Sequence, residues 1–207
     1  MDLNPPDEER NLTFELPEGW FVLEAELATR RAALDAEVAA WAAEATDRAP
    51  HREDLVEILW GFGMEADQKG ALFAAVFWEP GEYGPIAANL MVFEGQRSVP
   101  ESIEAEVAAA LRDLAEPDPH DHGPRAVSEV RLPIGPAARV RFLASSPADR
   151  DEGVGAALVL DATQVWIPLP AEPSMLIITG TTPCLIAAND VAAVVDAVAA
   201  SVRSVIS

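Results

Sequence analysis

The stretch from Arg125 to Thr182 constrains the fold more than any other part of the chain, because it is a nearly unbroken series of strand patterns. Apolar residues alternate with arginines in Val130-Arg131-Leu132 and in Val140-Arg141-Phe142. Such alternation is typical of half-buried strands, since successive side chains leave opposite faces of the pleat. Further apolar runs cover residues 154–160, 165–169 and 175–179. Turn-forming residues separate the runs, among them Asp161-Ala162-Thr163, so the stretch predicts an antiparallel meander.

Apolar residues at helical spacing predict helices on either side of the meander. One helix is expected within residues 24–48, a second from Arg52, and a third behind the capping box of Ser98 and Glu101. The last helix is expected to be capped by Asn189 or Asp190 and to carry a stripe of valines: Val191, Val195, Val198, Val202 and Val205. Strands are predicted over residues 12–16, 71–78 and 86–93.

These elements predict an α+β fold in which helices flank an antiparallel sheet on both faces. A chain of 207 residues can bury about 70% of its unfolded surface as one domain. We therefore expect an acidic, disordered leader over residues 1–10 and a single domain over residues 11–207.

The formal net charge of −21 narrows the function classes. Nucleic acids and anionic lipids are bound chiefly through their phosphates, so a surface this negative indicates neither a nucleic-acid nor a membrane partner. Such a charge ordinarily serves solubility, and a basic partner or a cation is the alternative. The acidic, proline-broken N-terminus and the lack of a long apolar run predict a cytoplasmic protein.

The segment Phe14-Glu15-Leu16-Pro17-Glu18-Gly19-Trp20 resembles the opening strand and tryptophan turn of the PsbP-like superfamily. That superfamily includes the Ran-binding nuclear-import factor and several bacterial lipoproteins. The arginine-bearing strand pair and the long C-terminal helix are similar as well. The resemblance implies an α-β-α sandwich with a binding or assembly role and no catalysis.

The loop His120-Asp121-His122 is the one place where metal ligands cluster in the sequence. Two imidazoles and a carboxylate on alternating loop positions could meet one Zn²⁺. A solvated polar loop is the alternative, and we favour it because a tight site needs a fixed geometry and a second shell of supporting groups. We therefore expect no cofactor.

Cys184 is the single cysteine, which excludes an internal disulfide and a thiolate metal cluster. It follows a strand and precedes a helix, where a nucleophile could be exposed. Its neighbours Leu185 and Ile186 favour a buried cysteine that acts as a small hydrophobe.

Arginines concentrate between Arg125 and Arg150. If the hairpin around Gly135 has an odd number of loop residues, the side chains of Arg131, Arg139 and Arg141 share one face of the sheet. Such a patch could hold an anion or an acidic partner. The alternative, which we favour, is that these arginines pair with carboxylates of the same chain.

Trp60 lies off the apolar stripe of the second helix, and with Phe62 and Met64 it could form an apolar patch for a partner. The sequence favours a non-catalytic protein-binding or assembly module, either with a protein partner or as a homodimer. The alternative is a small-molecule-binding protein or a metal-dependent enzyme with a cleft between residues 24–70 and the sheet.

Overall fold

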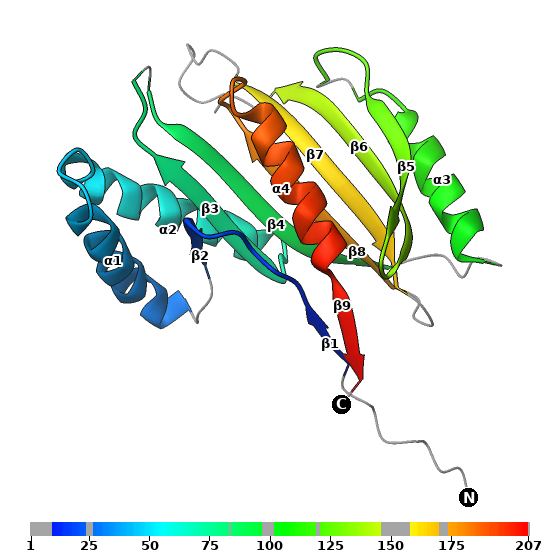
Figure 1. Cartoon of the computed structure of the whole chain (residues 1–207), viewed down its shortest axis with the longest axis horizontal. Helices are drawn as coiled ribbons and strands as arrows, with labels where there is room; N and C mark the ends of the chain where they lie inside the picture. Colours follow the sequence, from blue (N-terminus) through cyan, green and yellow to red (C-terminus); the bar gives the residue numbers. More distant parts are fainter. Residues whose placement is uncertain are drawn as a thin grey trace, which may run out of the picture.

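A seven-stranded antiparallel sheet forms the centre of the protein (Figure 1). The computed structural model describes residues 10–23, 27–82, 84–96, 102–118, 121–145, 158–169 and 174–206. In order across the sheet, the strands are β2 (Trp20–Val22), β3 (Phe73–Glu79), β4 (Ile86–Gln96), β8 (Ser174–Thr182), β7 (Val159–Pro168), β6 (Gly135–Ser145) and β5 (Ala126–Leu132). Strands β5 to β8 follow one another in the chain and in the sheet, as the meander predicted.

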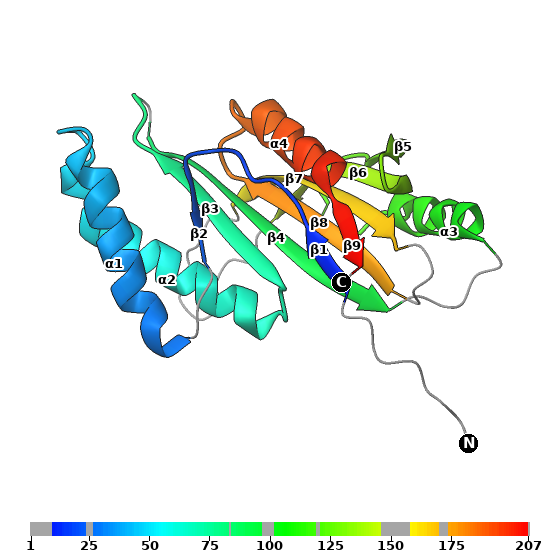
Figure 2. The same cartoon turned by 60° about the horizontal axis from the view of Figure 1, so that its bottom comes forward.

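Helices cover both faces of this sheet, so the predicted α+β fold is confirmed. Helix α4 (Ala188–Ser201) lies on one face, as Figures 1 and 2 show. On the other face, α1 (Leu27–Ala43) and α2 (Arg52–Gln68) cover the β3 end, and a short 3-10 turn, η1 (Ala49–His51), joins them. Helix α3 (Ile103–Ala115) covers β5, β6 and β7 on that same face.

The alternation of apolar residues along β4 explains how both faces are filled. Leu90 and Val92 belong to the core under α4, whereas Met91, between them, belongs to the core under α1 and α2. Of the predicted valine stripe, Val195, Val198 and Val202 are each 0% exposed in the core under α4. A methyl group added at Gly180 would lie 2.4 Å from Val195 Cγ2, so this glycine lets α4 lie close on the sheet.

The predicted break at Asp161-Ala162-Thr163 is wrong, because these residues lie inside β7. Asp161 is 8% exposed and accepts hydrogen bonds from Arg141 Nε on the neighbouring strand, at 3.0 and 3.1 Å. Thr163 lies in the ladder between Arg141 on β6 and Gly180 on β8. A cross-strand ion pair therefore stabilises the carboxylate of Asp161 within the strand, although the sequence pattern predicts a turn there.

Two predicted helix boundaries are also wrong. Helix α3 begins at Ile103, and its cap is Ser102, whose Oγ accepts a hydrogen bond from the Ala105 amide at 3.1 Å. The predicted capping pair, Ser98 and Glu101, lies outside the described residues. Helix α4 begins at Ala188 without a side-chain cap, before Asn189 and Asp190.

The C-terminal helix also ends earlier than the valine stripe indicates. After Val202 the chain becomes β9 (Arg203–Ile206), which pairs antiparallel with β1 (Arg10–Thr13). Val205 therefore lies in a strand opposite Asn11. The predicted strand over residues 12–16 is reduced to the end of β1, and Phe14 and Leu16 pack against the core under α4.

Candidate protein-binding surface

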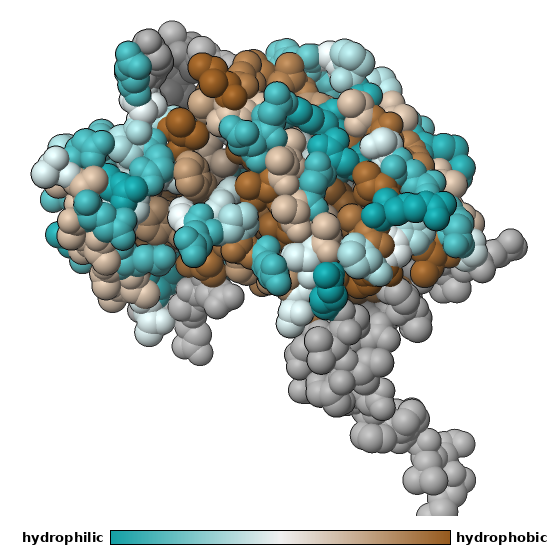
Figure 3. Space-filling model, viewed as in Figure 1, coloured by the Kyte–Doolittle hydropathy of each residue, from teal (hydrophilic) through white to brown (hydrophobic). Residues whose placement is uncertain are grey.

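Large apolar side chains are exposed together at one end of the sheet. Ile86 begins β4 directly after the β3–β4 hairpin loop, and Leu185 and Ile186 lie in the loop between β8 and α4. Their exposed fractions are 36%, 54% and 90%. Hydrophobic residues are exposed over the start of α4 and beside the hairpin in Figure 3. We define the hairpin-end surface as Ile58, Pro85, Ile86, Pro183, Leu185 and Ile186.

The hairpin loop owes its tight shape to two glycines. Gly84 has a φ of +122°, and a methyl group added at Gly81 would lie 2.6 Å from the Gly84 carbonyl oxygen. Both positions therefore require glycine. Pro80 and Pro85 flank the glycines, and they limit the freedom of the loop further.

Thr182 ties the β8–α4 loop to the strand beside it. This residue is 0% exposed, and its Oγ1 donates a hydrogen bond to the Ala87 carbonyl at 2.6 Å. The same oxygen accepts a hydrogen bond from the Cys184 amide at 3.0 Å. Ala87 follows Ile86 and Cys184 precedes Leu185, so Thr182 fixes the two sides of the surface relative to each other.

The β8–α4 loop exposes its large residues because small ones occupy the inner positions. The amide of Ala187 donates to the Cys184 carbonyl at 2.9 Å, which closes a turn before α4. Ala187 and Ala188 are buried behind this turn. Leu185 and Ile186 therefore project outward into solvent.

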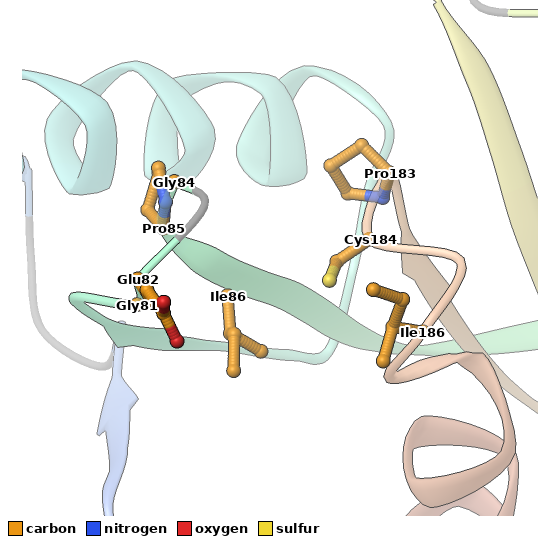
Figure 4. Close-up of a pocket in the computed structure, with 8 residues that line it drawn as sticks. All are labelled: Gly81, Glu82, Gly84, Pro85, Ile86, Pro183, Cys184 and Ile186. Atoms are coloured by element: carbon orange, nitrogen blue, oxygen red, sulfur yellow. The ribbon is translucent and has the colours of Figure 1, made fainter.

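A cavity of about 520 Å³ lies between the two loops (Figure 4). Ile86 and Glu82 line it from the hairpin, and Cys184 and Ile186 line it from the loop before α4. Cys184 is half-buried, so the expectation of a buried cysteine is wrong. The reason is that Leu185 and Ile186 face solvent instead of drawing the loop into the core.

A second depression of about 270 Å³ lies on the α2 side of the same hairpin. Ile58, which is 48% exposed, and Trp78 line it together with Pro80 and Pro85. The His51 ring lies at its edge, with its centroid 5.1 Å from that of Trp78. Because Gly81, Gly84 and Pro85 line both depressions, the apolar surface continues around the hairpin.

The sequence pattern did not predict this surface, although two segments suggest exposed apolar residues. Ile86 directly follows a loop rich in proline and glycine, and Leu185 and Ile186 stand between Pro183 and the start of a helix. Apolar residues in such short connections can be exposed or buried. Which of the two occurs depends on packing that the sequence pattern does not specify.

The predicted interface residues Trp60, Phe62 and Met64 lie on α2 and are all half-buried. Trp60 and Phe62 pack against the core shared by α1 and α2. The guanidinium of Arg31 lies 5.7 Å from the Trp60 ring centroid. Trp60 thus contributes to the packing between the two helices, and its part in an interface stays a prediction.

The arginines do not form the predicted shared patch. Leu132 pairs with Gly135, so the β5–β6 loop has two residues, an even number. Arg131 consequently lies on the α3 face, opposite the face of Arg139 and Arg141. Arg139 Nε lies 2.7 Å from Asp196 of α4, and Arg141 pairs with Asp161, so these two arginines are paired within the chain, as favoured.

Of the predicted metal loop, His120 lies outside the described residues. Asp121 forms an ion pair with Arg125 at 2.6 Å, and His122 Nε2 is hydrogen-bonded to Ser145 Oγ. Within the part of the chain that the structure describes, no three histidine, cysteine, aspartate or glutamate side chains are grouped to hold a metal ion.

The region of the predicted cleft between residues 24–70 and the sheet contains a depression of about 280 Å³. Arg30 and Asp67 line it, and they form an ion pair at 2.7 Å. The charged groups here therefore neutralise each other, and the small-molecule or metal-dependent alternative gains no support from them.

No described helix is both long and apolar enough to span a membrane.

Comparisons with known proteins do not identify a family for this chain. No protein-family model matches the chain, and no curated protein matches it. Among solved structures, the chain is similar to LpqN of Mycobacterium tuberculosis, whose structure is described as that of a protein involved in cell envelope biogenesis. The alignment covers 96% of this chain and 85% of that chain, with a TM-score of 0.46 and 10% identity. A likeness at this level carries no argument about function, and the PsbP-like resemblance stays a prediction.

Proposed function

We propose that the protein is a non-catalytic protein-binding or assembly module whose contact site is the hairpin-end surface. The observation that carries this proposal is the exposure of Ile186 and Leu185, at 90% and 54%, beside the half-exposed Ile86. Exposed apolar patches of this kind are typical of interaction sites.

The rigidity of the surface supports the same proposal. Thr182 joins both of its sides through two hydrogen bonds, and paired glycines and prolines shape its hairpin. A surface that is already ordered loses little conformational entropy when a partner binds, so more of the contact energy appears as affinity.

A pair of serine substitutions tests this function. Tagged wild type and the Leu185→Ser/Ile186→Ser variant would each be expressed in cells of the source organism, cross-linked and purified with their bound proteins. We expect the variant to lose a bound protein that wild type retains, by roughly tenfold or more, because truncation of central interface residues commonly removes at least that much affinity.

Leu72→Ser supplies the matched control. Leu72 is also an exposed leucine, at 61%, but it precedes β3 at the opposite end of that strand. Its loss should leave the bound protein in place, and both variants should melt close to wild type, since surface substitutions usually change stability by about 0.5 kcal/mol or less. An identical set of bound proteins in all three samples would refute the proposal.

A further inference from the structure

Among the described residues, the charged side chains that line the two depressions of the hairpin-end surface are carboxylates. Glu82 lines the cavity beside Ile86, and Asp54 lines the depression beside Ile58. Asp190 is exposed in the first turn of α4, just beyond Ile186. Within the described part of the chain, no lysine or arginine lines the two depressions.

The arginines near this region are already paired with carboxylates of the same chain. Arg141, which donates to Asn189 at the start of α4, pairs with Asp161. Arg48 contacts Glu44 and Glu79, at 2.5 Å each, and Arg52 contacts Asp35 at 2.9 Å. These ion pairs neutralise the carboxylates Glu44, Glu79 and Asp35 and leave no excess positive charge beside the apolar residues. The described part of the hairpin-end surface is therefore apolar at its centre and acidic at its rim.

We infer that the hairpin-end surface binds a basic, apolar segment of a partner protein, in which lysine or arginine flanks large aliphatic side chains. This inference rests on the proposed function. The aliphatic side chains would pack against Ile86 and Ile186, while the basic ones would face Glu82, Asp54 and Asp190. A net charge of −21 would also accelerate the encounter with a basic segment.

A second copy of this chain fits the surface less well. Two copies would bring their acidic rims together, and each copy also carries a net charge of −21. Like charges placed opposite each other at an interface oppose association. A small ligand fits poorly too, because a small-molecule site buries most of its ligand. The cavity between the two loops is open to solvent, since Ile186, which lines it, is 90% exposed.

Peptide binding tests the inference directly. The probe is a short fluorescent peptide of leucine and lysine with leucine at helical spacing, and its counterpart carries glutamate in place of lysine. We expect the lysine peptide to bind and the glutamate peptide to bind at least tenfold more weakly. Amide NMR shifts on adding the lysine peptide should be largest at residues 81–84, 86 and 184–187.

Two double variants separate the charge from the apolar contact. In Asp54→Asn/Glu82→Gln we expect roughly three- to tenfold weaker binding of the lysine peptide at low salt, with the difference shrinking as salt is added. Glu104→Gln/Asp113→Asn, on the exposed side of α3, removes the same charge far from the surface and should change binding less than about twofold. Leu185→Ser/Ile186→Ser should weaken binding about tenfold or more.

The outcomes distinguish this inference from the proposed function. Equal weakening by the two charge variants, or equal binding of both peptides, would overturn the inference of a basic partner. Loss of a cellular partner from Leu185→Ser/Ile186→Ser would still support the proposed binding module. A dimer in sedimentation that this variant abolishes would likewise overturn the inference of a basic partner, because the occupant would then be a second copy. If the serine variant changes neither peptide binding nor the bound proteins, both proposals are wrong.

Discussion

Asp161 shows how a single residue can change the apparent architecture. Its sequence neighbourhood predicts a turn, yet it lies within β7, where Arg141 satisfies its carboxylate. Arg141 also donates from Nη1 to Asn189 Oδ1 at 2.8 Å, so the ion pair links β6 and β7 to the start of α4. The ion pair with Arg141, which is distant in the sequence, thus outweighs the turn propensity of Asp161.

Asp161→Asn should lower the free energy of unfolding by about 1–3 kcal/mol. The substitution keeps the shape of the side chain but leaves the half-buried Arg141 without its charged partner. Urea unfolding at neutral pH, with the midpoint and the slope fitted together, measures the change.

Asp196→Asn is the matched control for that measurement. Asp196 pairs with Arg139 at 2.7 Å, but its side chain is 47% exposed. Solvent screens such a pair, so the loss should stay below about 1 kcal/mol. Equal losses in both variants would contradict a special role for the pair inside the sheet.

Among the elements, α4 was predicted best and its ends worst. The buried valines recur at helical spacing, so the period alone specified the face that meets the sheet. The ends depended on contacts outside the helix. Val205 extends the valine pattern, but pairing with β1 draws it into β9 instead. Boundaries of this kind are set by partners that the local sequence does not contain.

Gly180→Ala should destabilise the packing of α4 on the sheet by about 1–3 kcal/mol. The added methyl group would lie 2.4 Å from Val195 Cγ2, and a fully buried helix and strand have little room to separate. In a Val195→Ala background the same substitution should cost at least about 0.5 kcal/mol less, because the clashing methyl group is gone. Thermal unfolding of the four proteins in this cycle gives the coupling, and additive costs would contradict the close approach.

At the scale of the whole molecule, the α+β architecture was predictable and the binding surface was not. Strand alternation from Val130 to Phe142 and the helical stripes followed directly from burial of one face of each element. The hairpin-end surface depends on the relative position of two loops, near Ile86 and Ile186, that are far apart in the sequence. The antiparallel pairing of β4 with β8 and the hydrogen bond from Thr182 Oγ1 to the Ala87 carbonyl bring these loops together.

Removal of residues 191–207 should unfold the protein. The deletion exposes the sheet face beneath Val191, Val195 and Val198, and buried valines contribute roughly 1.5–3 kcal/mol each, against a typical total stability of 5–15 kcal/mol. Circular dichroism during heating should show no cooperative transition. As a control, removal of residues 203–207 alone should preserve the cooperative transition, because α4 stays intact. A cooperative transition after removal of residues 191–207 would contradict this prediction.

The pairing of β1 with β9 has a mechanical consequence. Arg10 lies opposite Ile206, at the outer end of a short antiparallel ladder, and Thr13 lies opposite Arg203 at its inner end. The hydrogen bonds of such a ladder run perpendicular to the strands. A force that pulls residues 10 and 206 apart therefore loads these bonds one pair at a time, like a zipper, so the ladder opens at low tension before any load reaches α4 or the large sheet.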